Sequence, residues 1–121
     1  VVDKKGTKKW YKNGRLHRED GPAWINAKGK GWFKNGKMHR EDGPAVIETD
    51  GSKEWFINGK EHREDGPARI DADGSKLWYI NGKKHRLDGP AVIRPNGAKF
   101  WYINGVEYSE EGWKEEVKTL K

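Results

Sequence analysis

Short apolar segments alternate with polar turns along the chain. Segments such as Trp55-Phe56-Ile57 and Ala45-Val46-Ile47 are rich in aromatic and β-branched residues, which favour strands. Pairs such as Asn58-Gly59 and Asp50-Gly51 separate them. These pairs are strong hairpin signals, because type I′ turns need positive φ at both central residues. The pattern predicts antiparallel hairpins along most of the chain.

The pattern recurs with a period of 22 to 23 residues. Each unit starts at a Trp, an Asn-Gly pair follows at a fixed offset, and complete units continue with His-Arg-Glu-Asp-Gly-Pro-Ala. The tryptophans that mark the repeat are Trp10, Trp32, Trp55, Trp78 and Trp101. We therefore expect a mainly β protein, an open antiparallel β-meander of about five hairpin units in which each unit is stabilised by its neighbours.

The turns set the expected boundaries of one repeat domain, residues 1–121. The units span about residues 6–28, 29–50, 51–73, 74–96 and 97–108. Beyond them, Ser109 is a plausible N-cap, and acidic residues follow it in the first turn. Trp113, Val117 and Leu120 lie at helical spacing. We expect a helix over residues 109–120 that caps the open end of the sheet.

Alternation along each strand assigns side chains to two faces. Each Trp shares a face with the residue two positions later. The position between the Ala and the Ile that recur in every complete repeat varies, as is typical of a solvated or binding face. The residues at this position are Trp24, Val46, Arg69 and Val92. The aromatic residue after each Trp points to the opposite face, either as a stacking platform or as a second small core. We favour the core, because a thin sheet needs both faces partly covered. These residues are Tyr11, Phe33, Phe56, Tyr79 and Tyr102.

Composition limits both the core and the chemistry. Leu, Ile, Val and Phe total only 20 of 121 residues, whereas there are seven Trp and four Tyr, so the core must be thin and rich in Trp. The absence of Cys excludes disulfides and thiol catalysis. No nucleophile motif surrounds any Ser, and no Gly-rich phosphate loop opens a helix. We therefore predict no enzyme activity and no cofactor.

Each heptapeptide carries a His with an Asp three residues later. The pairs are His17 and Asp20, His39 and Asp42, His62 and Asp65, and His85 and Asp88. A metal or acid–base site is one interpretation, but zinc usually needs four ligands and every unit repeats the same pair. We predict a structural pair in which the Asp accepts N–H bonds in the turn and orients the imidazole, with no metal bound.

The arginines of the heptapeptides also have two interpretations. Cross-strand ion pairing with the neighbouring Glu residues is the structural one, which we favour, and a row of guanidinium groups for phosphates or carboxylates is the functional one. Charge adds weight to anion binding, because residues 1–40 hold 12 basic and 3 acidic side chains, against 13 and 16 in residues 41–121. The candidates are Lys8, Lys9, Arg15, Arg18, Arg40, Arg63 and Arg86.

The unit Trp-Tyr/Phe-x-Asn-Gly-x-x-His-Arg-Glu-Asp-Gly-Pro-Ala resembles the HREDGPA hairpin repeats of phage and environmental bacterial proteins, over residues 6–120. It is more loosely similar to MORN repeats, whose common Gly-x-Gly signature is absent here. The resemblance implies a β-hairpin array used for binding in a phage context, and it implies no catalytic residues.

We therefore predict a non-catalytic module that binds another protein, as a phage-encoded structural or counter-defence factor in the host cytoplasm or on the virion. The partner-binding candidates are Tyr11, Lys12, Trp24, Phe33, Lys34 and Arg69. The alternative is a binder of nucleic acid or a nucleotide through the basic first unit and the Arg and aromatic rows. Self-association through open sheet edges is a third hypothesis.

Overall fold

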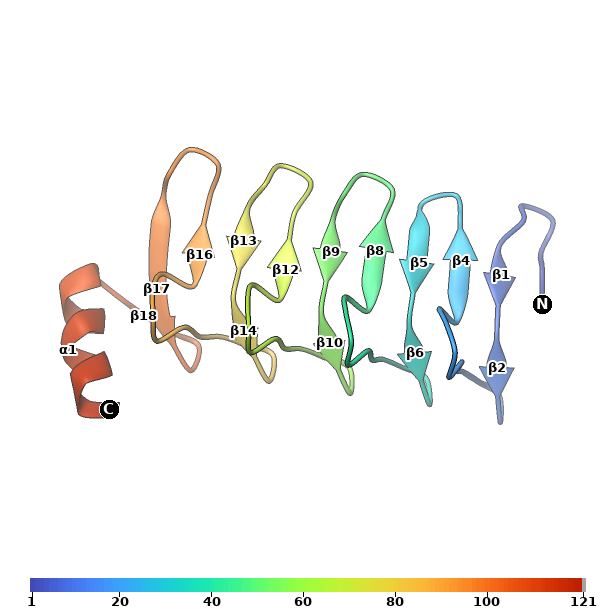
Figure 1. Cartoon of the computed structure of the whole chain (residues 1–121), viewed down its shortest axis with the longest axis horizontal. Coiled ribbons are helices and arrows are strands. Elements are labelled where there is room, and N and C mark those ends of the chain that lie inside the picture. Colours follow the sequence, from blue (N-terminus) through green and yellow to red (C-terminus); the bar gives the residue numbers. More distant parts are fainter. Residues whose placement is uncertain (121) are drawn as a thin grey trace.

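The computed structural model describes residues 1–120, in which eighteen short strands follow one another along the long axis of the molecule and a helix closes one end (Figure 1). Ten strands belong to one large sheet. They are β1 (Lys8–Lys9), β4 (Trp24–Asn26), β5 (Gly29–Gly31), β8 (Val46–Glu48), β9 (Lys53–Glu54), β12 (Arg69–Ile70), β13 (Lys76–Leu77), β16 (Val92–Ile93), β17 (Lys99–Ile103) and β18 (Val106–Tyr108). Each is paired antiparallel with the strand before it in this order. The predicted mainly β meander is confirmed.

A small two-stranded hairpin extends from the large sheet in each of the first four repeats. The pairs are β2 (Tyr11–Lys12) with β3 (Arg15–Leu16), β6 (Phe33–Lys34) with β7 (Lys37–Met38), β10 (Phe56–Ile57) with β11 (Lys60–Glu61), and β14 (Tyr79–Ile80) with β15 (Lys83–Lys84). The predicted continuous strand Trp55-Phe56-Ile57 is therefore divided. The N–H of Trp55 donates to the carbonyl of Ala68 in the large sheet, at 2.7 Å, whereas β10 pairs with β11.

The Asn-Gly pairs form the turns of these hairpins and of the last one. Every Asn of the five pairs has φ between 49° and 53°, and every Gly has φ between 75° and 82°. Positive φ at both central residues is the property of the type I′ turns predicted from sequence. The residues with this geometry are Asn13, Asn35, Asn58, Asn81 and Asn104 with the glycines that follow them.

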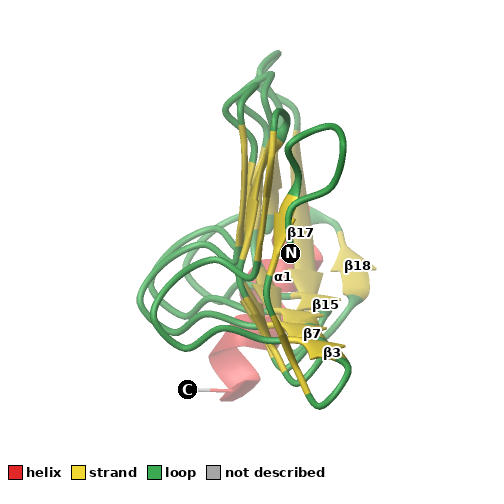
Figure 2. Ribbon diagram, turned by 90° about the vertical axis from the view of Figure 1, so that its right-hand side faces the viewer, coloured by secondary structure: helices red, strands yellow, loops and turns green. Residues whose placement is uncertain are grey.

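The large sheet has two unlike faces. Seen along the array, the loops that follow each His bulge from one side, and the small hairpins project from the other (Figure 2). We call these sides the loop face and the hairpin face. On the loop face, each repeat Trp lies beside the Ala of the following loop, and together they form a Trp–Ala row along the array. The N–H of Trp32, for example, donates to the carbonyl of Ala45 at 2.6 Å. The alanines of this row, Ala23, Ala45, Ala68 and Ala91, are completely buried and form the centre of the thin core.

The helix α1 (Glu110–Leu120) packs against β17 and β18 at the end of the array. The hydroxyl of Ser109 accepts a hydrogen bond from the N–H of Gly112 at 3.1 Å, which confirms the predicted N-cap. Val117 is buried and Trp113 is half-buried, but Leu120 is 54% exposed. The indole N–H of Trp113 also donates to the Arg86 carbonyl of the fourth loop at 2.9 Å. The predicted three-residue stripe is wrong at Leu120, in the last turn of the helix. No helix within residues 1–120 is long and apolar enough to cross a membrane.

Candidate functional site

Each arginine of the heptapeptide is held by its own loop. The Cζ of Arg40 lies 3.9 Å from the centroid of the Trp32 ring. Its Nε donates to Asp42 at 2.9 Å, and its Nη1 donates to the Pro44 carbonyl at 3.1 Å. The equivalent groups in the other repeats, Arg18, Arg63 and Arg86, make the same three contacts. The expected pairing with Glu of a neighbouring unit is wrong, because the fixed loop brings the Asp two residues later to the guanidinium.

These contacts leave the arginines poorly suited to bind an anion. One face of each guanidinium covers a Trp ring, and the glycine of the same loop lies beside it. A Cβ placed on Gly43 would lie 3.0 Å from the Cζ of Arg40. The hydrogen bond from Arg40 lowers the pKa of Asp42, so the pair stays ionised. The arginine row is therefore part of the scaffold.

The histidines connect consecutive repeats. The backbone N–H of Asn58 donates to Nδ1 of His39 at 2.9 Å, and Nε2 of His39 lies 3.5 Å from a Glu41 oxygen. Because Nδ1 accepts, the neutral ring carries its proton on Nε2. The same link from the next Asn-Gly turn is made to His17, His62 and His85. The predicted His–Asp pair is thus wrong: the Asp binds the Arg, and the His binds the next repeat.

Two backbone bonds accompany each histidine link. At the second junction, Gly59 N–H donates to the Met38 carbonyl at 2.8 Å and Arg40 N–H donates to the Phe56 carbonyl at 3.1 Å. An intramolecular hydrogen bond contributes about 1 kcal/mol net. Each small hairpin is therefore held to its neighbour by these three bonds, as well as to the large sheet.

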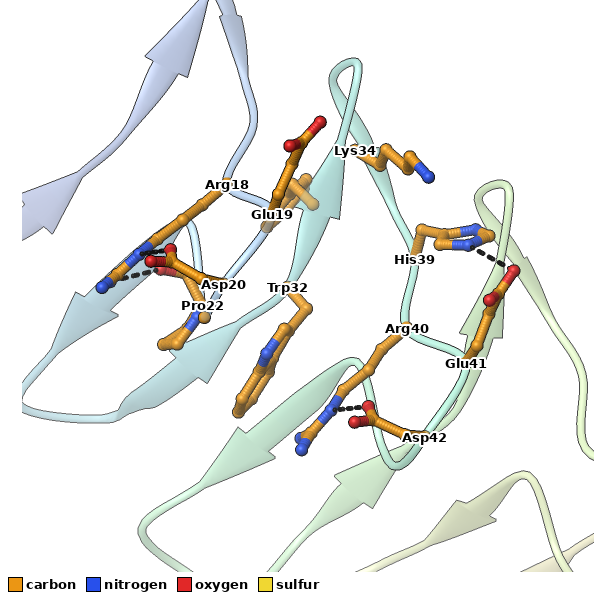
Figure 3. Close-up of a pocket in the computed structure, with 12 residues that line it drawn as sticks. Arg18, Glu19, Asp20, Pro22, Trp32, Lys34, His39, Arg40, Glu41 and Asp42 are labelled. Atoms are coloured by element: carbon orange, nitrogen blue, oxygen red, sulfur yellow. Dashed lines mark hydrogen bonds and ion pairs between the residues drawn. The ribbon is translucent and has the colours of Figure 1, made fainter.

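Three shallow grooves lie between consecutive loops, with volumes of about 750, 770 and 610 Å³. In the first, Trp32 forms one wall and the carboxylates of Glu19, Asp20, Glu41 and Asp42 line its rim (Figure 3). These carboxylates are 73–88% exposed. Within residues 1–120, no group of three His, Asp or Glu side chains is arranged to hold a metal ion. Each groove thus offers exposed carboxylates and an indole surface, with arginine side chains between them: Arg18 and Arg40 in the first, Arg40 and Arg63 in the second, and Arg63 and Arg86 in the third.

The hairpin face carries an aromatic cluster in the first two repeats. Gly31 has no side chain, so Phe33 and Trp24 pack over its backbone. A Cβ at Gly31 would lie 3.0 Å from the Phe33 ring and 3.4 Å from the Trp24 ring. Trp24 and Phe33 are half-buried. Tyr11, at the end of the same aromatic row, is 51% exposed.

One lysine lies beside this cluster, and two others lie on the opposite side of the small hairpins. Lys9 lies directly opposite Trp24 in the large sheet. Lys12 and Lys34 follow Tyr11 and Phe33 in their strands, so they point to the other face, and Lys34 lines the first groove. The structure therefore brings together three of the six predicted partner-binding residues, Tyr11, Trp24 and Phe33. We call these three residues and Lys9 the aromatic–lysine surface.

Arg69, the sixth candidate, lies two repeats away in an ion-pair cluster. Its Nε donates to Asp71 at 2.7 Å, and Glu54 is its partner in strand register. Burial raises the pKa of both Glu54 and Glu61, and one Glu61 oxygen is buried without a hydrogen-bond partner among residues 1–120. The charge of Arg69 offsets the half-buried carboxylates of Glu54 and Glu61, so Arg69 has a structural role.

The remaining predictions for the hairpin face are partly confirmed. Phe56 is buried, and Tyr79 and Tyr102 are half-buried, so the aromatic row is core in the middle of the array. Val92 is only 2% exposed, because it lies beside the buried Leu77 in strand register. The expectation of a solvated variable position is therefore wrong at Val92.

The three other basic candidates are not brought together. Lys8 lies on the loop face and Lys9 on the hairpin face, because they are adjacent in one strand. The side chain of Arg15 packs over Gly36 of the next repeat. Sequence reasoning also missed four lysines equivalent to Lys8, although a signal was present, since a Lys stands two residues before every repeat Trp. They are Lys30, Lys53, Lys76 and Lys99.

Comparison with protein-family models, curated proteins and solved structures gives no match to this chain.

Proposed function

We propose that the chain is a non-catalytic binding module whose aromatic–lysine surface engages a protein partner. The observation that carries this proposal is the packing of Trp24 and Phe33 over Gly31, beside the exposed Tyr11. Trp and Tyr anchors dominate the energetics of protein interfaces. The rings here are supported by backbone on one side and reach solvent on the other.

A binding role also fits the way the repeat uses its ionisable groups. The Arg and Asp of each heptapeptide stabilise their loop, and the His links two repeats. Every unit repeats these contacts, so no single unit is distinguished as a reaction centre. The phage setting, structural or counter-defence, rests on the resemblance of the motif and forms part of the proposal.

Nucleic acid is the second candidate ligand for the same surface. The 12 basic against 3 acidic side chains in residues 1–40 favour it, and the exposed ring of Tyr11 is available to stack on a base. The Arg row supports this alternative less, because each guanidinium already donates to the Asp and to the Pro carbonyl of its own loop. Lys9 and the other lysines of the first two repeats would have to supply the phosphate contacts.

Affinity capture from a cell lysate separates the two ligands. The protein is immobilised and the lysate is applied with and without nuclease, at about 150 mM and about 500 mM salt, because phosphate contacts weaken steeply as salt rises. A protein retained at both salts and unaffected by nuclease supports the proposal. Nucleic acid that is lost at high salt would replace it with the alternative.

Surface variants then locate the interface. Trp24→Ala removes an anchor, whose truncation costs about 2 kcal/mol or more in a typical hot spot, which is roughly a thirtyfold loss of affinity. Phe100→Ala is the matched control, because Phe100 occupies the same row of the hairpin face at the other end of the array and is 38% exposed. Equal retention by both variants would place the partner elsewhere.

A further inference from the structure

A row of alternating lysines and isoleucines crosses the loop face, next to the Trp–Ala row. Strand register puts nine residues in line: Lys8, Ile25, Lys30, Ile47, Lys53, Ile70, Lys76, Ile93 and Lys99. The five lysines are exposed and the four isoleucines are half-buried. Neighbouring strands lie about 4.8 Å apart, so the lysines recur about every 9.6 Å. We call this line the Lys–Ile row.

The lysines of this row have no carboxylate partner within the described chain. Among residues 1–120, the only lysines that form ion pairs are Lys114 and Lys118, both in α1. The row therefore presents five free ammonium groups at a fixed spacing, with apolar side chains between them. This combination suits a partner that offers carboxylates at the same spacing.

A second charged row runs parallel to it on the same face. It consists of the exposed carboxylates of the loops: Glu19, Asp20, Glu41, Asp42, Glu64, Asp65 and Asp88. We call it the acidic loop row. Both rows receive their residues once per repeat, so their periods are equal. In each of the first three loops an Arg is paired with the Asp, and the Glu leaves the loop with a net negative charge, whereas the fourth loop is neutral because it carries Leu87. Over these three loops the acidic loop row is opposite in sign to the Lys–Ile row.

The two rows together select the kind of partner. A nucleic acid or other uniform polyanion lying on the Lys–Ile row would run beside the acidic loop row and be repelled by it. A matching partner needs one negative and one positive row with the same period. A second copy of this chain has both.

We propose that two copies of the chain associate through their loop faces, with the Lys–Ile row of each copy against the acidic loop row of the other. Figure 2 shows the required shape: the loops bulge from one half of the loop face, and the other half of the sheet is bare. Rotation of a second copy by 180° about the long axis places its loops over the bare half of the first. The order of repeats is kept, so each repeat faces its equivalent, as in an isologous dimer.

This dimer is independent of the protein partner proposed above. The aromatic–lysine surface lies on the hairpin face, which points away from the dimer interface and stays open. Because the interface is largely formed by exposed charges, it weakens with salt, whose screening length is about 10 Å at 0.1 M. We expect the dissociation constant of the dimer to rise at least about tenfold between roughly 50 mM and 500 mM salt.

Charge reversal on either row tests the dimer by sedimentation velocity. Lys30→Glu with Lys53→Glu places two negative charges at the centre of the Lys–Ile row, and Glu41→Lys with Glu64→Lys places two positive charges at the centre of the acidic loop row. The fold tolerates the second change at this position, since the fourth repeat carries Leu87 there. Each double variant is expected to be a monomer by itself. An equimolar mixture of the two is expected to form a heterodimer, because each reversed row then meets an opposite charge.

The matched control is Lys37→Glu with Lys60→Glu. These lysines come from the same two repeats and are equally exposed, but they lie in the small hairpins β7 and β11. This variant has the same change in net charge and is expected to remain a dimer. Circular dichroism and tryptophan fluorescence confirm that each variant keeps its fold.

Three results would overturn the proposal. The first is a wild-type chain that stays a monomer up to about 1 mM, a concentration at which even weak dimers form. The second is a dimer that neither double variant disrupts, and the third is an equimolar mixture of the two variants that forms no heterodimer. If a variant does not fold, carbodiimide cross-linking of the wild-type chain is the second test, using mixed heavy- and light-isotope protein. Cross-links between copies from Lys30 or Lys53 to the acidic loop row are expected, and their absence would also refute the dimer.

Discussion

Replacement of Arg63 tests whether the arginine of each loop stabilises the whole array. Its Cζ lies 4.0 Å from the centroid of Trp55, its Nε donates to Asp65 at 3.0 Å, and its Nη1 donates to the Pro67 carbonyl at 3.1 Å. The side chain is 25% exposed. A partly exposed cation–π contact contributes about 0.5–1 kcal/mol, a charged hydrogen bond about 1.5, and an exposed ion pair less than about 1. We expect Arg63→Ala to reduce the free energy of unfolding by about 2–3 kcal/mol.

Arg63→Lys separates charge from shape. A lysine keeps the positive charge, but one ammonium group cannot lie flat on Trp55 while bonding to both Asp65 and Pro67. We expect it to recover less than half of the loss. The assay is urea unfolding followed by tryptophan fluorescence and circular dichroism, with the exposed Lys60→Ala as control. Loss of no more than about 0.5 kcal/mol in Arg63→Ala, the range of ordinary surface changes, would refute the reasoning, as would wild-type stability in Arg63→Lys.

The remaining predictions concern pH and the turns. Burial lowers the pKa of His85 below its usual 6.5, because the folded protein favours the neutral ring. The contribution of His85 to the free energy of unfolding is therefore complete above pH 6.5 and is lost as the pH falls toward the pKa in the folded state. Leu87→Glu supplies the carboxylate present in the other repeats, and it should reduce the loss in melting temperature between about pH 7.5 and 5.5. Burial and the charge of Glu54 raise the pKa of Glu61, so its stabilising contribution is full at low pH and is lost as the pH rises. Glu61→Gln should therefore raise the melting temperature at about pH 7 and make no difference near pH 4. Asn58 has φ of 49°, so Asn58→Ala should cost about 1–2 kcal/mol in urea unfolding and Asn58→Gly much less; equal losses would show that the turn geometry is not responsible.

The roles of the heptapeptide residues show where sequence reasoning reached its limit. The even repetition of His, Arg and Asp indicated a structural role, and the structure gives each of them one. Their partners could not be read from spacing. The distance along the chain from His39 to the Asn58 that binds it is 19 residues, and only the packing of one hairpin against the next brings them together.

The candidate binding surface was predicted in part. Trp24 was a candidate because it is an aromatic residue at a variable position in a basic region, and it lies beside Phe33 because Gly31 has no side chain between them. Arg69 stands at the equivalent variable position but belongs to a different environment, where Asp71 and Glu54 neutralise it. The sequence alone could not distinguish the two, because the neighbours of a strand residue come from other strands.

The sequence by itself determined the local geometry and the repeat. Asn-Gly turns depend on the backbone preferences of two adjacent residues, and the N-cap of α1 depends on Ser109 and the first turn that follows it. Such features need no distant contacts, so they were predicted correctly. The period of 22 to 23 residues likewise specified a stacked array.

Only the tertiary structure decided which side chains share a row. Lys30 lies between Ile25 and Ile47 because two strand registers align them, and a shift of one residue would turn each of them to the opposite face. The same packing closes the loops over the tryptophans, which occupies the arginines and leaves the carboxylates and the lysines exposed in separate rows. Register and loop packing arise from contacts between repeats. For this reason, the positions of the charged rows could not be predicted from the sequence and are defined only by the folded array.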